Sequence, residues 1–117
     1  MSTISANDLQ NTSGGIPTVK GQRLIPTAWV NFNGSVIAIR DSENVSSITD
    51  NGVGQYAVNF IVTMANYGYS VSCTAKTGGI MGGGDAAGLG YALVTAVTDT
   101  GSYYDSNYMF VTTMGGQ

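Results

Sequence analysis

Acidic side chains are the groups in this sequence that could do chemistry, because histidine is absent and cysteine occurs only once. Without histidine no Ser–His or Cys–His nucleophile pair can form, and the commonest general base is missing. Two carboxylates facing each other across a cleft could still hydrolyse a glycosidic bond. Most of the acids fall in turn-like segments, where an Asp side chain typically bonds to nearby backbone N–H groups, so we expect no catalytic residue. The seven acids are Asp8, Asp41, Glu43, Asp50, Asp85, Asp99 and Asp105.

Two groups of these acids are chemically able to bind calcium, but their spacing matches no specific calcium loop. The first is Asp41, Glu43 and Asp50, and the second is Asp99 and Asp105. One cysteine and no histidine exclude a structural zinc site. The glycine-rich segment 82–90 lacks the Gly-Lys-Ser/Thr ending of a phosphate-binding loop, and it predicts a flexible surface loop instead. We therefore expect no metal and no cofactor.

The single cysteine, Cys73, has Val71 and Ala75 on the same face of an alternating segment. This pattern indicates a buried strand position. A reactive thiol needs a histidine or a cation to lower its pKa, and Lys76 is the only cation nearby. We expect Cys73 to be a structural core residue.

The composition excludes several classes of partner. Only 9% of residues are charged, 43% are hydrophobic and the net charge is −3. The four basic residues, Lys20, Arg23, Arg40 and Lys76, are spread along the chain, whereas nucleic-acid and anionic-membrane binding need clustered Lys and Arg. Solubility must depend on Asn, Ser, Thr and Gly, and such a surface tolerates close packing against copies of itself.

No stretch approaches the roughly 18 consecutive apolar residues that a membrane span needs. The residues after Met1 contain neither the basic segment nor the apolar run of a secretory signal. We expect a protein that does not insert into membranes and is made in the cytoplasm without an export signal.

The first 27 residues differ in composition from the rest. They contain both prolines, the Gly14-Gly15 pair and no aromatic residue, and no helical or strand period persists in them. We interpret residues 1–27 as an extended N-terminal docking arm, with a disordered terminus as the alternative. An arm without its own core orders only against a partner, so its apolar residues Ile16, Pro17, Leu24 and Ile25 are candidate partner contacts.

From residue 28 onward the pattern is of strands and turns. Alternation predicts strands over 28–32, 36–40, 45–49, 55–63, 69–75, 91–97 and 108–113. The dipeptide Asn33-Gly34 predicts a type I′ hairpin turn, and residues 41–44 look turn-like. With about seven strands and no amphipathic helix, residues 28–117 predict an all-β fold, an antiparallel β-sandwich or a small barrel-like relative.

Aromatic residues are the remaining candidates for binding. Trp29 lies on the strand face opposite Val30 and Phe32, and it either joins the core or meets a neighbouring copy. Tyr103 and Tyr104 lie in the polar loop 99–107, where tyrosine suits protein interfaces and sugar stacking alike. The alternative is that strands are simply rich in tyrosine.

The segment 28–75 resembles a module found in bacteriophage tail fibre proteins. The resemblance rests on the order and spacing of AWVNFNG at 28–34, IR at 39–40, NVSSITDNG at 44–52, then Gly54, Tyr56, VNF at 58–60 and YSV at 69–71. The end of the chain, 105–113, loosely resembles the closing strand of that module. Residues 76–100 depart from it.

The resemblance implies a non-enzymatic structural protein of the virion of a tailed bacteriophage. It implies a fibre-type component that forms a homotrimer and is attached through its N-terminal arm to tail, baseplate or capsid proteins. Two alternatives remain open. One is a host-attachment module that binds a host-surface glycan through loops 76–90 and 99–107, and the other is a capsid decoration or cement protein.

Overall fold

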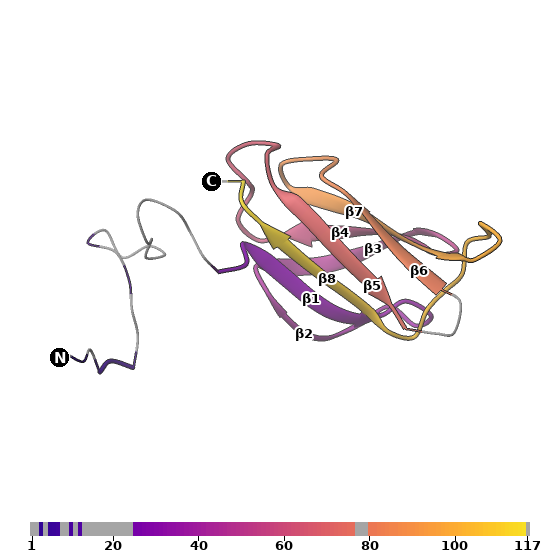
Figure 1. Ribbon diagram of the computed structural model, residues 1–117, viewed down its shortest axis with the longest axis horizontal. Helices are drawn as coiled ribbons and strands as arrows, with labels where there is room; N and C mark the ends of the chain where they lie inside the picture. Colours follow the sequence, from indigo (N-terminus) through magenta and orange to yellow (C-terminus); the bar gives the residue numbers. More distant parts are fainter. Residues whose placement is uncertain are drawn as a thin grey trace.

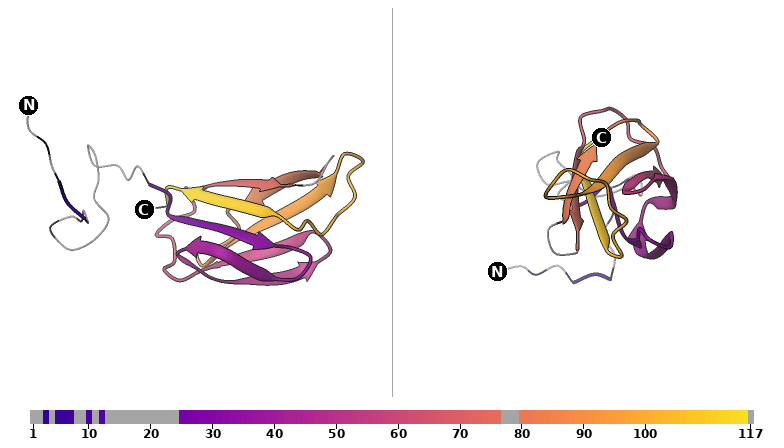
Figure 2. Two further views of the ribbon diagram at one scale, coloured as in Figure 1. Left: turned by 90° about the horizontal axis from the view of Figure 1, so that it is seen from below. Right: turned by 90° about the vertical axis from the view of Figure 1, so that its right-hand side faces the viewer.

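The computed structural model describes residues 3, 5–7, 10, 12, 25–76 and 80–116. Within these residues the protein is all-β and contains no helix. Two four-stranded antiparallel sheets pack face to face (Figure 1, Figure 2), which confirms the predicted β-sandwich. There are eight strands where the sequence predicted about seven, because the glycine-rich segment contributes a strand of its own.

The first sheet has the order β2-β1-β8-β5 and the second has the order β3-β4-β7-β6. All pairs within each sheet are antiparallel. The first sheet consists of β2 (Ala38–Glu43), β1 (Ala28–Asn33), β8 (Met109–Met114) and β5 (Ser70–Ala75). The second consists of β3 (Val45–Gly52), β4 (Gln55–Phe60), β7 (Tyr91–Thr98) and β6 (Ile80–Asp85).

The core lies between the sheets and follows the alternation of the sequence. In β1, β7 and β8 every second residue is buried, because successive side chains of a strand point to opposite faces. Phe32 and Tyr56 meet edge to face with ring centroids 5.3 Å apart, and Phe60 and Tyr69 do so at 5.9 Å. Residues buried in the core include Val30, Phe32, Tyr56, Val58, Phe60, Tyr69, Ala92, Val94, Ala96, Met109 and Val111.

The β1–β2 hairpin was predicted correctly, but its type I′ turn was wrong. Neither Asn33 nor Gly34 has a positive φ, and the turn spans residues 34–37. The Asn33 Oδ1 atom accepts hydrogen bonds from the backbone N–H groups of Ser35 (2.8 Å) and Val36 (3.1 Å). Glycine is needed at 34 because a Cβ there would lie 2.5 Å from the Tyr56 hydroxyl.

Two other predicted boundaries were also wrong, and Asn44 accounts for both. Residues 41–43 extend β2, and β4 ends at Phe60, which leaves Val62 exposed instead of on the buried face. Asn44 has a left-handed φ of 57°. Its side-chain amide accepts from the Val62 N–H and donates to the carbonyls of Val62 and Thr27. These bonds turn the chain between the sheets and stop β4 from continuing.

The prediction of a flexible surface loop at 82–90 was also wrong in its first part, because Gly82, Gly83 and Gly84 lie within β6. A Cβ on Gly82 would lie 2.5 Å from the Cys73 carbonyl oxygen, and one on Gly84 would lie 2.5 Å from Val71 Cγ1. The missing side chains therefore let β6 pack directly against β5 of the other sheet. Hydrophobic alternation could not reveal this strand, since its inward positions 82 and 84 are glycines.

Antiparallel strands place the connections at two opposite ends of the sandwich. The chain enters at one end, called here the entry end, which also holds Asn44 and residues 61–69, 86–90 and 115–116 (Figure 1). The far end holds the connections 34–37, 53–54 and 99–108. Strands of six to eight residues separate the two ends by about 20 Å, at about 3.3 Å per residue.

Candidate functional site

The predicted binding loop 99–107 is fixed to the far end by Asp105. Its Oδ1 atom accepts hydrogen bonds from the Gly54 N–H at 2.8 Å and from the Tyr56 hydroxyl at 2.9 Å. The Tyr56 hydroxyl also lies 2.8 Å from the Gly34 carbonyl oxygen. The Asp105 carboxylate thus ties its own loop to the connection 53–54 and, through the Tyr56 hydroxyl, to the connection 34–37. This gives Asp105 a structural explanation.

Burial and this carboxylate both act on Tyr56. The ring is fully buried, and removal from water raises the pKa of the phenol well above its ordinary value. The hydrogen bond to Asp105 and its negative charge raise it further. Tyr56 therefore stays protonated at physiological pH and serves as a hydrogen-bond donor.

Tyr103 and Tyr104 lie at the surface of this end, and their role in partner binding stays a prediction. Tyr103 forms an isolated bridge with Val97, and the Tyr104 N–H donates to the Ala96 carbonyl. Val36 and Val53 lie on the connections bonded to the same loop. We call Val36, Val53, Tyr103 and Tyr104 the far-end patch, and each leaves at least 43% of its surface exposed.

Of the four candidate partner contacts in the N-terminal arm, only one lies within the described residues. Ile16, Pro17 and Leu24 lie outside the described residues. Ile25 is about half exposed immediately before the first strand. The interpretation of residues 1–27 as a docking arm therefore stays a prediction.

Trp29 lies on the outer surface of the first sheet and not in the core. It faces away from Val30 and Phe32, as its alternation predicted, and it is partly exposed. Directly beside it in register are Glu43 on β2 and Thr112 on β8. We call the outer surface of the first sheet the open face. Its outward residues are Trp29, Asn31, Asp41, Glu43, Ser70, Ser72, Thr74, Phe110, Thr112 and Met114, bordered toward the far end by Arg40, Lys76 and Tyr108.

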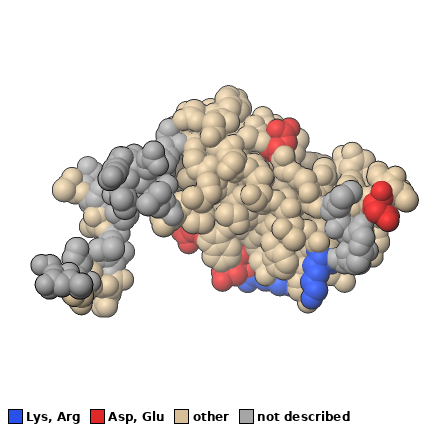
Figure 3. Space-filling model, viewed as in Figure 1, with Lys and Arg blue, Asp and Glu red and all other residues tan. Residues whose placement is uncertain are grey.

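Arg40 and Lys76 converge on one aromatic ring at the border of the open face. They come from opposite edges of the sheet, and their charged atoms lie 4.2 Å and 5.1 Å from the centroid of Tyr108. The Arg40 guanidinium also donates to Asn31 Oδ1 at 3.2 Å and to the Asn107 carbonyl at 2.6 Å. These contacts with neutral groups hold the arginine in place. In Figure 3 the basic side chains (blue) lie at the lower edge of this face, with acidic side chains (red) beside them and elsewhere on the face.

Sequence reasoning did not single out Arg40, Tyr108 and Phe110 as one group. The alternation of Tyr108, Phe110 and Thr112 was visible in the sequence and signalled a shared face. The pairing of β1 with β8 joins residues about 80 positions apart, and no local pattern predicts it. A register shift opposite Asn31 and Phe32 brings Arg40 to this face, and such a bulge is equally invisible in the sequence.

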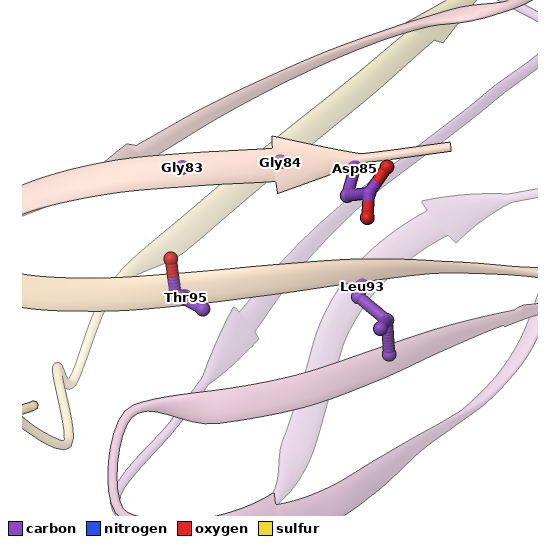
Figure 4. Close-up of a pocket in the computed structure, with 5 residues that line it drawn as sticks. All are labelled: Gly83, Gly84, Asp85, Leu93 and Thr95. Carbon is purple, nitrogen blue, oxygen red and sulfur yellow. The ribbon is translucent and has the colours of Figure 1, made fainter. Parts of the chain in front are cut away.

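A shallow hollow of about 320 Å³ lies on the outer surface of the second sheet (Figure 4). Its lining is Gly83, Gly84, Asp85, Leu93 and Thr95. It contains one carboxylate, whereas glycosidic hydrolysis needs two. The hollow therefore offers no constellation for that reaction.

Cys73 lies partly buried on β5 and packs against the core. Burial raises the pKa of its thiol to about 11, despite a backbone hydrogen bond from Gly83 that lowers it. The thiol is therefore protonated at neutral pH and a poor nucleophile.

Within the described ranges, no group of three or more Cys, Asp or Glu side chains is placed to hold a metal ion. The first calcium group considered above, Asp41, Glu43 and Asp50, is therefore not assembled there. The same part of the chain contains no helix long and apolar enough to cross a membrane.

Comparison of the chain with protein-family models, with curated proteins and with solved structures gave no match. The fold and the surfaces described above therefore carry the functional argument by themselves.

Proposed function

We propose that this protein is a structural component of the virion of a tailed bacteriophage, a fibre-type protein attached through residues 1–27. The observation that carries the proposal is the polarity of the sandwich. The N-terminal segment joins the domain at the entry end, and the far-end patch is exposed about 20 Å away. This arrangement suits a protein that is anchored at one end and presents a contact surface at the other.

The resemblance of residues 28–75 to the tail fibre module supports the same proposal. The polar groups near the far-end patch also support it, because they bond to one another and hold the connections in place. Asp105 and Tyr56 are engaged in this way. A rigid surface of this kind suits binding, since ordered contact residues lose little further entropy when a partner docks.

In this proposal the chain assembles as a homotrimer, as the resemblance implies. Side-chain surfaces with few charges suit close packing of copies, because they carry little mutual repulsion. Multi-angle light scattering of the full chain is expected to give three times the 12.1 kDa mass of one chain. A strict monomer at working concentration overturns the trimer.

The direct test of the proposal is the composition of purified virions. Mass spectrometry is expected to detect the protein in gradient-purified particles, and immunogold labelling is expected to place it on the tail or baseplate. Labelling of the capsid shell would instead favour a decoration or cement protein. Absence from intact particles overturns the virion proposal altogether.

The role of the arm is tested in the full-length chain. Ile16→Asp combined with Leu24→Asp is expected to reduce incorporation into particles at least tenfold, because charges replace the apolar contacts of the arm. Val53→Ser at the far end is the matched control and is expected to leave incorporation unchanged. Equal incorporation of both variants contradicts attachment through the arm.

The exposed Tyr103 and Tyr104 favour one alternative function, recognition of a host-surface glycan at the far end. Substitution of both tyrosines by serine is then expected to reduce adsorption of particles to host cells without changing incorporation. Unchanged adsorption rejects this alternative.

A further inference from the structure

The open face presents aromatic rings among short hydroxyls and one amide, with Asp41 and Glu43 at its β2 edge. Met114 is its large aliphatic-type residue. The strongly exposed aliphatic residues lie instead at the two ends, and they include Val36, Val53, Ile61 and Val62. The two ends therefore offer aliphatic side chains of the kind that pack against a protein partner. The open face instead offers aromatic rings set among polar groups.

Three of these rings form a strip across the first sheet. Tyr108 and Phe110 lie two residues apart on the same face, with centroids 6.2 Å apart and planes inclined by 38°. Trp29 continues the strip beside Thr112 on the neighbouring strand. Tyr108 and Phe110 are 40% and 36% exposed. Each ring therefore lies against the sheet and keeps part of its surface open to a ligand.

Hydrogen-bonding side chains lie beside each ring in register. Phe110 is flanked by Asn31 on β1 and by Thr74 on β5, and Thr112 is flanked by Trp29 and Ser72. A pyranose ring has an apolar face made of C–H groups and a rim of hydroxyls. Amphipathic rings combined with short polar groups match both parts of such a ligand.

The charge on this face is unevenly placed. Arg40 and Lys76 converge on Tyr108, and they are the two basic residues within the described residues. Asp41 and Glu43 lie at the β2 edge, beside Asn31 and Trp29. Positive charge therefore gathers at the far-end border of the strip, and the acids disfavour an anion along the β2 edge.

We propose that the open face binds an acidic polysaccharide. One sugar unit stacks on Phe110 beside Tyr108, with its carboxylate directed to Arg40 and Lys76, which lie over the Tyr108 ring. Neighbouring units follow the strip toward Trp29, with their hydroxyls bonded to Asn31, Ser72, Thr74 and Thr112. The guanidinium is held by its bonds to Asn31 and Asn107, so little ordering of its side chain is needed on binding.

This site lies on a sheet face, and it shares with the loops at 76–90 and 99–107 that the sequence indicated for glycan binding only Lys76 and the Asn107 carbonyl that holds Arg40. It also does not depend on the proposed virion role. A protein absent from virions can still bind the polysaccharide, and a virion protein can fail to bind it, so the two proposals fail separately.

The test is affinity electrophoresis of the full-length protein in native gels that contain a polysaccharide. The acidic probes are polygalacturonate, alginate, hyaluronan and chondroitin sulfate, and the neutral probe is dextran. At least one acidic probe is expected to retard the protein, with dextran giving no retardation. Binding is expected to weaken as salt increases, because charge contributes to it.

Variants locate the binding on the open face. Phe110→Ser and Arg40→Gln are each expected to raise the Kd at least tenfold, and Lys76→Gln at least threefold. Tyr67→Ser, which changes an exposed tyrosine at the entry end, is the matched control and is expected to leave the Kd unchanged. Circular dichroism melting checks that each variant is folded, and the two charge variants remain informative if Phe110→Ser is not.

Three outcomes overturn the proposal. The first is that no acidic probe retards the protein. The second is that dextran binds as tightly as the best acidic probe. The third is that the open-face variants and Tyr67→Ser change the Kd equally.

Discussion

At each end of the sandwich, buried or partly buried polar side chains hydrogen-bond the connections to one another. The two ends use different chemical groups for this. At the entry end, the neutral amide of Asn44 bonds to the backbone of Val62 and Thr27, and the Tyr69 hydroxyl lies 2.5 Å and 2.9 Å from the carbonyl oxygens of Gly88 and Tyr91. At the far end, the carboxylate of Asp105 bonds to Gly54 and Tyr56.

This difference separates two tasks. A neutral amide can both donate and accept, so Asn44 satisfies N–H and C=O groups at the crossing between the sheets. A carboxylate only accepts, and its hydrogen bonds are stronger, so Asp105 gathers donors from the connection 53–54 and from β4 and fixes the loop with Tyr103 and Tyr104. We therefore expect the far end to depend on charge and the entry end to be insensitive to it.

Asp105→Ala is expected to have the largest effect on stability. It leaves the Gly54 N–H and the Tyr56 hydroxyl without their charged acceptor, and this should lower the free energy of unfolding by about 2–4 kcal/mol. Urea denaturation followed by Trp29 fluorescence measures the change. Asp99→Ala, an exposed acid in the same loop, is the control and should change stability by less than about 0.5 kcal/mol. Equal losses in both variants would remove the special role of Asp105.

Asn44→Ala is expected to cost about 1–3 kcal/mol, since it removes three hydrogen bonds and places alanine at a left-handed φ. Asn44→Gly separates the two causes, because glycine adopts that φ without strain. Its loss in urea denaturation should be smaller than that of alanine by about 1 kcal/mol. Identical stability of both variants and the native chain would show that the crossing is held by packing alone.

The two buried tyrosines sharpen the comparison, because one hydroxyl bonds to a charged acceptor and the other only to carbonyls. Tyr56→Phe is expected to be more destabilising than Tyr69→Phe, by about 1 kcal/mol. The double variant Tyr56→Phe with Asp105→Ala should lose less than the sum of the single variants, since the partners share one network. Additive losses would mean that the two side chains act independently.

Alkaline pH gives the smallest effect and tests the sign of the electrostatics. Burial first, then Asp105, raises the pKa of Tyr56 above its ordinary 10.0. Above about pH 10 the unfolded chain loses this proton while the folded chain keeps it, so stability is complete below pH 10 and falls as the pH rises. The slope of the free energy of unfolding against pH between 9.5 and 10.5 should be shallower in Tyr56→Phe than in the native chain. An unchanged slope contradicts the assignment.

Much of the fold followed from the sequence, because alternation directly records which strand face is buried. The inward positions of β1 and β4 were predicted in this way, and so was the placement of Trp29 on the face opposite Val30 and Phe32. Whether Trp29 joins the core was left open. The glycine strand β6 was missed for a physical reason. Gly82 and Gly84 bury backbone instead of side chains, so their positions leave no hydrophobic signal.

The candidate surfaces were less predictable than the fold. Tyr103 and Tyr104 were found because a polar loop with two tyrosines is unusual in itself. The group of Arg40, Tyr108 and Phe110 depends on the pairing of strands distant in sequence and on a shift of register, both of which tertiary packing decides. Asp105 looked like an ordinary turn residue because its partners, Gly54 and Tyr56, lie about 50 positions away.

The shift of register between β1 and β2 also affects how copies of the chain can meet. β2 is an outermost strand of its sheet, and such strands can template the addition of foreign strands and lead to aggregation. An irregular ladder, together with the charged side chains of Arg40, Asp41 and Glu43, makes this edge a poor template. Copies of the chain are therefore not expected to join through the β2 edge, and association there has to use side-chain surfaces.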